Sequence, residues 1–336
     1  MKFDDNADLD TSQVDDIRGQ GGGVGGGDGG GGGGMFGGGA GGGRFPIPGR
    51  MAAGGGGAML LILGLVLRAC LGGGGGSAFN LPGAGSQSVQ VQPQNPNAVQ
   101  LGRGAASGVT QNCKTGADAN RRQDCRIVGI ANSVQAYWAD DLPRRGKEYV
   151  KAKTVLFSGS VTTGCGGATA AAGPFYCPAD QRVYLDLDFF KVFESQFGGT
   201  DTPFTEAYVI AHEYGHHVQN LLGISAKVEK SGDRQGATSS SVRLELQADC
   251  FAGVWAKNAT SGPSPLIVNL TDKDITEGLD AAAKVGDDYI QKNLGGGRVN
   301  PDAWTHGSSE ERQRWFRNGY KTGELTDCDT FNTDTL

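Results

Sequence analysis

Apolar side chains recur every three or four residues along two stretches in the second half of the chain, and both predict helices packed on a core. The first stretch begins at Thr202-Pro203, where a threonine N-cap precedes proline at the first helical position, and Gly223 can end it. The second stretch covers Val242–Asn258. Gly215 lies inside the first helix, where glycine costs about 1 kcal/mol relative to alanine. We therefore expect another backbone, or a metal site, to approach Gly215 closely.

Shorter patterns predict further elements, namely helices over Arg126–Leu142, Thr276–Ile290 and Glu310–Gly319 and strands over Lys153–Val161 and Arg182–Phe190. From Val183 to Asp188 apolar and polar residues alternate, as in a half-buried strand. At a sheet edge beside the first helix, this strand could hold an extended peptide by main-chain pairing. An ordinary sheet strand is the alternative interpretation.

The first third of the chain lacks this periodicity. Residues 1–18 are acidic and residues 19–43 are almost pure glycine, which cannot bury enough apolar surface to fold. We therefore expect residues 1–50 to be a disordered tail. Residues 73–110, rich in Gly, Pro, Ser, Gln and Asn, are expected to be a flexible linker, and residues 111–336 are long enough to form the folded domain.

Residues 51–72 form one apolar run of about the length that crosses a bilayer, although glycines dilute it and it carries Arg68. Arg44 and Arg50 flank its N-terminal side. The run predicts a single transmembrane signal anchor, with the tail in the cytoplasm and the domain outside the cell membrane. A short buried hydrophobic segment is the alternative. Cys70 could indicate a lipoprotein, but Arg68 and the long preceding tail disfavour that interpretation.

Charge and cysteine content narrow the class of protein. The net charge of −6 and the absence of a basic stripe argue against nucleic-acid binding. Six cysteines besides Cys70 favour disulfides in an oxidising compartment. They allow 15 pairings. Proximity in the sequence favours Cys113–Cys125 and Cys165–Cys177, which leaves Cys250–Cys328.

The residues that carry chemistry are His212-Glu213-Tyr214-Gly215-His216, inside the first predicted helix. Residues four apart share a helix face, so His212 and His216 can bind one metal ion. Imidazole nitrogens suit Zn²⁺, and Glu213 lies near enough to act on a zinc-bound water whose pKa is about 7. The bare pattern also occurs by chance on solvated helices, so the surrounding residues must support the assignment.

The second helix offers a third ligand, because Glu245 and Asp249 stand four residues apart on one face. Glu245 can complete a site of two histidines and one glutamate. Asp249 can then accept the second N–H of a ligand imidazole and fix its tautomer. Direct ligation by Asp249 is the main competing assignment.

Only two other histidines occur in the chain, His217 and His306. His306 is the one imidazole left that could stabilise the oxyanion of a tetrahedral intermediate, although a tyrosine or arginine could serve. His217 projects about 100° away from His216 on the helix, so we interpret it as a supporting or structural residue rather than a ligand.

From about Cys113 to its end, the chain resembles the bacterial family of putative neutral zinc metallopeptidases, which are membrane-anchored and similar in motif to the gluzincins. The resemblance rests on Ala207–Glu213, His216–Gln219, Arg243–Gly253, Thr305–Gly307, Ile130–Trp138 and Val183–Leu187. It implies an α+β, zincin-like domain with an active-site helix and a small antiparallel sheet. In gluzincins the glutamate of Glu-x-x-Ala-Asp ligates zinc and the aspartate supports a ligand histidine, which corresponds to Glu245 and Asp249.

The sequence therefore predicts a zinc-dependent endopeptidase that acts on a peptide or protein substrate, with Glu213 as general base. Two alternatives remain, a non-catalytic zinc-containing binding module of the cell envelope and a metallohydrolase acting on cell-wall amide bonds. The presence of Glu213 argues against the first, because a structural zinc site does not need that carboxylate.

Overall fold

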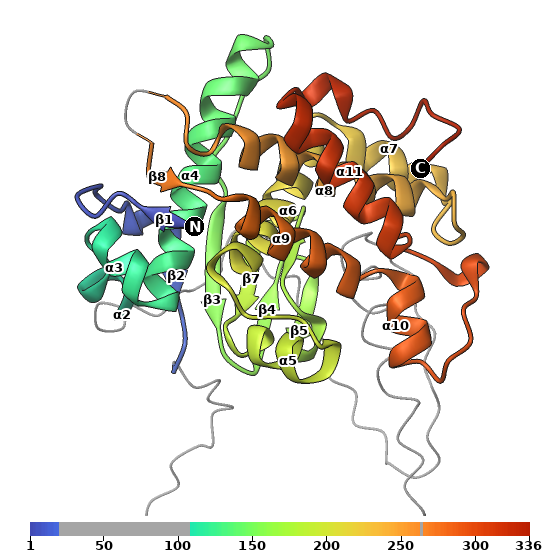
Figure 1. Cartoon of the computed structure of the whole chain (residues 1–336), viewed down its shortest axis with the longest axis horizontal. Coiled ribbons are helices and arrows are strands. Elements are labelled where there is room, and N and C mark those ends of the chain that lie inside the picture. Colours follow the sequence, from blue (N-terminus) through green and yellow to red (C-terminus); the bar gives the residue numbers. More distant parts are fainter. Residues whose placement is uncertain (20–107, 263–264) are drawn as a thin grey trace, which may run out of the picture.

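The computed structural model describes residues 1–19, 108–262 and 265–336, and in this part of the chain helices pack around a small mixed sheet (Figure 1). The helices are α2 (Gly108–Asn112), α3 (Gly116–Arg121), α4 (Gln123–Arg144), α5 (Asp188–Phe197), α6 (Pro203–Leu221), α7 (Ile224–Ser231), α8 (Ser240–Asn258), α9 (Asp272–Lys284), α10 (Asp287–Asn293) and α11 (Ser309–Thr322). Short 3-10 turns are η1 (Thr11–Gln13), η2 (Ala170–Ala172), η3 (Pro301–Ala303) and η4 (Leu325–Asp327). The strands are β1 (Lys2–Phe3), β2 (Val14–Asp16), β3 (Lys153–Phe157), β4 (Ser160–Thr163), β5 (Gly166–Thr169), β6 (Phe175–Cys177), β7 (Arg182–Asp186) and β8 (Ile267–Asn269).

The two main helical predictions are confirmed as α6 and α8. Thr202 caps α6 by accepting a hydrogen bond from the Thr205 N–H, and Gly223 follows the helix in the left-handed conformation. The helix predicted over residues 276–290 is instead two helices, α9 and α10. The chain breaks at Gly286, where an added Cβ would lie 2.4 Å from the Ser309 nitrogen, so α11 approaches closely at this point.

The main sheet has the strand order β2-β3-β7-β6. The β2–β3 and β3–β7 pairs are parallel, and β6 pairs antiparallel with β7. The expected antiparallel sheet is therefore wrong for this sheet, although β4–β5 and β1–β8 are antiparallel pairs. Strand β7 lies inside the sheet rather than at an edge and ends at Asp186, because α5 starts at Asp188. The edge strand on that side is β6.

The prediction that the acidic start of the chain is disordered is wrong for residues 1–18. They form β1, η1 and β2, and bury Phe3, Leu9 and Val14 in the core. The rest of the predicted tail, the apolar run 51–72 and the linker as far as residue 107 lie outside the described residues. Helix α2 begins at Gly108, before the predicted domain boundary at residue 111. Within the ranges that the structure describes, no helix combines the length and apolar character needed to cross a membrane.

All three predicted disulfides are confirmed, Cys113–Cys125, Cys165–Cys177 and Cys250–Cys328. Asp124 lies beside the first pair, but the two sulfurs are bonded to each other and do not offer a metal site. The third disulfide attaches the C-terminal segment to α8, one residue after Asp249.

Candidate metal centre

Helices α6 and α8 approach each other closely at Gly215. A Cβ added there would lie 3.0 Å from the Ala248 carbonyl oxygen and 3.1 Å from the Ala248 Cα. This confirms the expected close approach, and the neighbouring backbone is that of α8. The contact brings Glu245, one turn before Ala248, to the imidazoles of α6.

His212, His216 and Glu245 converge, with ligand atoms that all lie within 4.8 Å of one another. The Nε2 of His212 is 3.2 Å from Glu245 Oε2, and the Nε2 of His216 is 3.5 Å from Glu245 Oε1. Ligand atoms about 2.0–2.1 Å from a tetrahedral zinc ion are about 3.3–3.4 Å apart. The observed distances fit such an ion, and three protein ligands leave a fourth position open, as in catalytic rather than structural zinc sites.

The charges of these groups suit a cation. Burial disfavours the ionised carboxylate of Glu245, but His216, His306 and His212 outweigh that effect and hold its pKa well below the ordinary value. Burial likewise disfavours the imidazolium of His212, whereas Asp249 and Glu245 favour it and raise the pKa of His212 to about 10. A metal ion that binds here therefore displaces a proton from His212.

Asp249 lies behind His212 and does not join this cluster. Its Oδ1 is 2.8 Å from His212 Nδ1 and accepts a hydrogen bond of 2.6 Å from the Tyr208 hydroxyl. With Nδ1–H donated to Asp249, the Nε2 of His212 is the nitrogen left free for a metal ion. The geometry therefore favours Glu245 over Asp249 as the third ligand.

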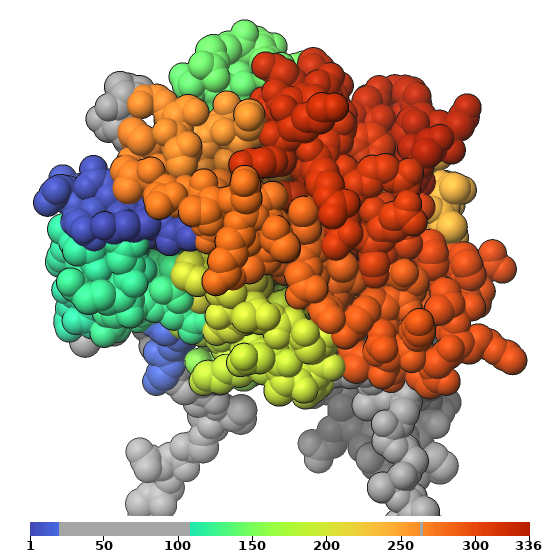
Figure 2. Space-filling view, viewed as in Figure 1, coloured from blue at the N-terminus to red at the C-terminus, as the bar shows by residue number. Residues whose placement is uncertain are grey.

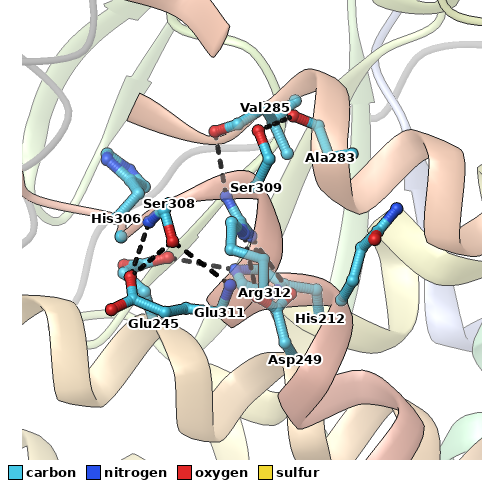
Figure 3. Close-up of polar contacts among 12 residues, drawn as sticks. His212, Glu245, Asp249, Ala283, Val285, His306, Ser308, Ser309, Glu311 and Arg312 are labelled. Atoms are coloured by element: carbon cyan, nitrogen blue, oxygen red, sulfur yellow. Dashed lines mark hydrogen bonds and ion pairs between the residues drawn. The ribbon is translucent and has the colours of Figure 1, made fainter. Parts of the chain in front are cut away.

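Arg312 on α11, which the sequence did not indicate as a site residue, also binds Asp249 (Figure 3). Its Nε donates to Asp249 Oδ2 at 2.8 Å and its second guanidinium nitrogen donates to Oδ1 at 3.1 Å. Arg312 also donates to the Val285 carbonyl at 3.2 Å. Although burial favours the neutral form of Asp249, Arg312 and His212 keep its pKa below the ordinary value.

Two glycines provide a sequence signal for this approach of α11 to α8. A Cβ on Gly253 would lie 2.1 Å from the Phe316 carbonyl oxygen, and one on Gly319 would lie 2.0 Å from the Cys250 carbonyl oxygen. Only glycine permits such backbone contacts. The close packing places Arg312 against Asp249.

Gln219, also missed, supports His216. Its Oε1 is 2.8 Å from His216 Nδ1, and its Nε2 donates to the Leu244 carbonyl and to Gln247 Oε1. Gln247 in turn donates to the Cys328 carbonyl at 3.0 Å. The spacing of His216 and Gln219, three residues apart on one helix, was a signal for this contact. Each ligand imidazole thus has a buried acceptor for its Nδ1–H.

Glu213 lines a cavity of about 500 Å³ together with His212, His216, Glu245 and His306. Its carboxyl is buried, and burial raises the pKa of Glu213 above the ordinary value. A carboxylate with a raised pKa beside the metal position suits proton transfer near neutral pH.

His306 faces this cavity from the loop before α11, and Asp287 holds the loop in place. Asp287 Oδ2 accepts hydrogen bonds from the backbone N–H groups of Thr305, His306 and Gly307, at 2.7–3.0 Å. Burial lowers the pKa of His306, but the charges of Glu245 and Asp287 outweigh it, and the net shift is upward. A protonated His306 can donate a hydrogen bond into the cavity.

His217 points away from the ligand cluster, as its position on the helix predicts. Its Nε2 donates to the Val150 carbonyl at 2.6 Å, and its Nδ1 is 3.0 Å from the Tyr176 hydroxyl. Burial lowers its pKa. His217 therefore joins α6 to β6, and its contact with the cavity is indirect, through Tyr176, which lines it.

Comparison with known proteins identifies a family and several relatives. The model of the family described as Putative neutral zinc metallopeptidase matches residues 5–331. The protein Rv2575 of Mycobacterium tuberculosis is 52% identical over 229 residues, which cover 67% of this chain and 76% of that protein. YpfJ of Escherichia coli K12 is 43% identical over 207 residues, covering 60% and 69%. Both relatives are described as uncharacterized. No solved structure matches the chain.

Proposed function

Because the chain belongs to the family of putative neutral zinc metallopeptidases, we propose that it is a zinc-dependent endopeptidase. One observation supports this most strongly. The Nε2 atoms of His212 and His216 and the carboxylate of Glu245 converge at zinc-like spacing, and Glu213 shares their cavity. A site that only stabilised the fold would not need Glu213 or an adjoining cavity of this size.

In this proposal, His212, His216 and Glu245 would hold a zinc ion, which would make a bound water more acidic and polarise the scissile carbonyl. Glu213 accepts a proton from the attacking water and passes it to the leaving amine. His306 donates a hydrogen bond to the developing oxyanion. Asp249 and Gln219 hold the two ligand imidazoles in the tautomer that presents Nε2, so the site needs little rearrangement when the ion binds.

The cavity wall supports a peptide substrate with a bulky apolar side chain. Phe189, Val192, Phe197, Val209 and Ile290 line it. Besides Glu213 and Glu245, the lining includes the acidic side chain of Asp188, which is paired with Lys191. The edge strand β6 also borders the cavity through Phe175 and Tyr176. We propose that the substrate backbone pairs with this edge while its apolar side chain enters the cavity.

The three disulfides support a location of the domain outside the cytoplasm, because such bonds persist in oxidising compartments. A cell-envelope position would also bring cell-wall peptides within reach of the site.

The test is digestion of casein and of purified peptidoglycan by the zinc-loaded full chain, with mass spectrometry of the products. New termini beside large apolar residues of casein would support the proposal. Cleavage of peptidoglycan alone would favour an amide hydrolase of the cell wall. Zinc binding with no cleavage of either substrate would favour a binding module and would contradict the proposed peptidase.

A further inference from the structure

The start of the chain completes the sheet that supports the metal centre. Strand β2 pairs in parallel with β3 over Val14 to Asp16, and the Ile17 N–H donates to the Leu156 carbonyl at 2.9 Å. At the other end of the segment, β1 pairs antiparallel with β8. Figure 2 shows residues 1–18, in blue, packed between the surfaces of α2–α3 and of the segment that carries β8.

Two asparagines of the domain bind the backbone of this segment as a neighbouring strand would. Asn120 accepts from the Phe3 N–H at 2.9 Å and donates to the Phe3 carbonyl at 3.0 Å. Asn132 does the same for Asp10, at 2.8 and 3.0 Å. These reciprocal pairs satisfy main-chain groups that the segment would otherwise leave without partners, so the domain has a site for this segment in particular.

Two glycines provide the space for the segment. A Cβ on Gly116 would lie 1.9 Å from the Asp4 carbonyl oxygen, and one on Gly129 would lie 2.6 Å from the Phe3 ring. The Phe3 side chain is 1% exposed. Any other residue at Gly116 or Gly129 would displace the segment, so this surface of α3 and α4 is shaped to receive it.

The described residues on either side of the gap between residues 19 and 108 lie close together on the domain. A Cβ on Gly108, the first residue of α2, would lie 3.9 Å from the Asp16 carboxylate at the end of β2. Arg18 also pairs with Asp124 on α4 at 3.3 Å. Residues 16–18 and Gly108 thus lie on the same side of the domain.

We infer that residues 1–18 are an integral part of the catalytic domain and lie in the same compartment as its metal centre. If the apolar run 51–72 enters a bilayer, the chain must return to the side from which it entered. The reason is that residues 16–18, before the run, and Gly108, after it, lie at adjacent points on the domain. A single crossing would separate residues 1–18 from their binding surface by about 30 Å of hydrocarbon. Residues 1–18 therefore cannot lie in the cytoplasm, as the sequence predicted, and also pack on a domain outside the membrane. This inference does not depend on peptidase activity.

Cysteine cross-linking in intact cells tests the inference. Lys2 and Asn269 are paired across β1 and β8 and are both exposed, so Lys2→Cys and Asn269→Cys place two thiols within linking distance. The full chain carries Cys70→Ala in every variant, so that this cysteine cannot react. Cells are treated with a short, membrane-permeant bismaleimide, and linked peptides, whether joined by the reagent or by a direct disulfide, are identified by mass spectrometry.

Two controls calibrate the result. Ser160→Cys with Thr169→Cys joins exposed partners of the β4–β5 hairpin and must link in any topology. Lys2→Cys with Thr335→Cys pairs the two ends of the chain, which lie far apart in Figure 1, and must not link. We expect the Lys2–Asn269 pair to link in most chains, as the hairpin pair does. Linking of the hairpin pair without the Lys2–Asn269 pair would overturn the inference.

Discussion

Replacement of Arg312 by methionine is the perturbation that best separates support of the site from the chemistry of the site. Arg312 acts on the proposed zinc ligands mainly through Asp249, to which it donates two hydrogen bonds of 2.8 and 3.1 Å. Its own approach to a ligand is a longer contact of 3.5 Å, from its guanidinium to His212 Nδ1. The side chains of Arg312 and Asp249 are 4% and 0% exposed. Methionine fills a similar volume and removes both the charge and the donors.

The expected loss of stability follows from this burial. Removing one partner of a buried ion pair leaves the other charge without compensation and costs about 3–5 kcal/mol. For a protein of this size, each kcal/mol lowers the melting temperature by about 2–4 °C, so the expected decrease is roughly 6–20 °C. The hydrogen bond to the Val285 carbonyl is also lost, which moves the estimate toward the upper end of the range.

Thermal and urea unfolding of the metal-free full chain measure this loss. The matched control is the double variant Asp249→Asn/Arg312→Met, in which a neutral amide can still accept from His212 without leaving a buried charge. We expect the double variant to recover much of the stability lost by Arg312→Met. Its zinc affinity should nevertheless stay about 10–100-fold below that of the parent, because the carboxylate behind His212 is gone. The reasoning would be refuted if the stability losses of Asp249→Asn and Arg312→Met, measured separately, simply added in the double variant. An unchanged melting temperature for Arg312→Met would refute it as well.

Three further predictions concern separate contacts. Gln219→Ala should weaken zinc binding about 10–100-fold in competition with a chelator, because His216 loses the acceptor for its Nδ1–H; an unchanged affinity would show that this contact does not orient the ligand. His306→Ala should lower kcat about 100-fold with little change in KM if the imidazole acts on the oxyanion, whereas an increase in KM alone would assign it to substrate binding. Phe3→Ala should lower the free energy of unfolding by about 3–5 kcal/mol in urea titrations, because the ring is buried against Gly129; a loss below about 1 kcal/mol would mean that the first residues add little to the fold.

The sequence was sufficient for the parts of the site that depend on local spacing. His212 and His216 share a helix face whatever surrounds them, and Glu245 and Asp249 share another. Gly215 signalled where the two helices meet. The disulfide pairs could also be predicted from the sequence, because proximity along the chain left few reasonable alternatives.

Contacts between distant segments could not be predicted from the sequence in the same way. Arg312 is one of many arginines in the sequence, and its role appears only when Gly253 and Gly319 bring α11 against α8. The first eighteen residues look disordered because the segment is short and acidic, yet β2 pairs with β3, and side chains of α4 bind Asp10 and Gln13 just before it. Strand β7 has the alternating pattern of a half-buried strand, but β3 and β6 pair with it on either side and its residues from Val183 to Asp186 are buried.

The central claim is that three residues bind zinc and that Glu213 transfers the proton. The most direct test measures zinc content and cleavage of casein by the full chain and by its Glu213→Gln variant. Glutamine is nearly isosteric but cannot accept the proton, so both proteins should bind one zinc ion and the variant should cleave about 10²–10⁴-fold more slowly. A Glu213→Gln variant that cleaves as fast as the parent, or a parent that binds no zinc, would contradict the account.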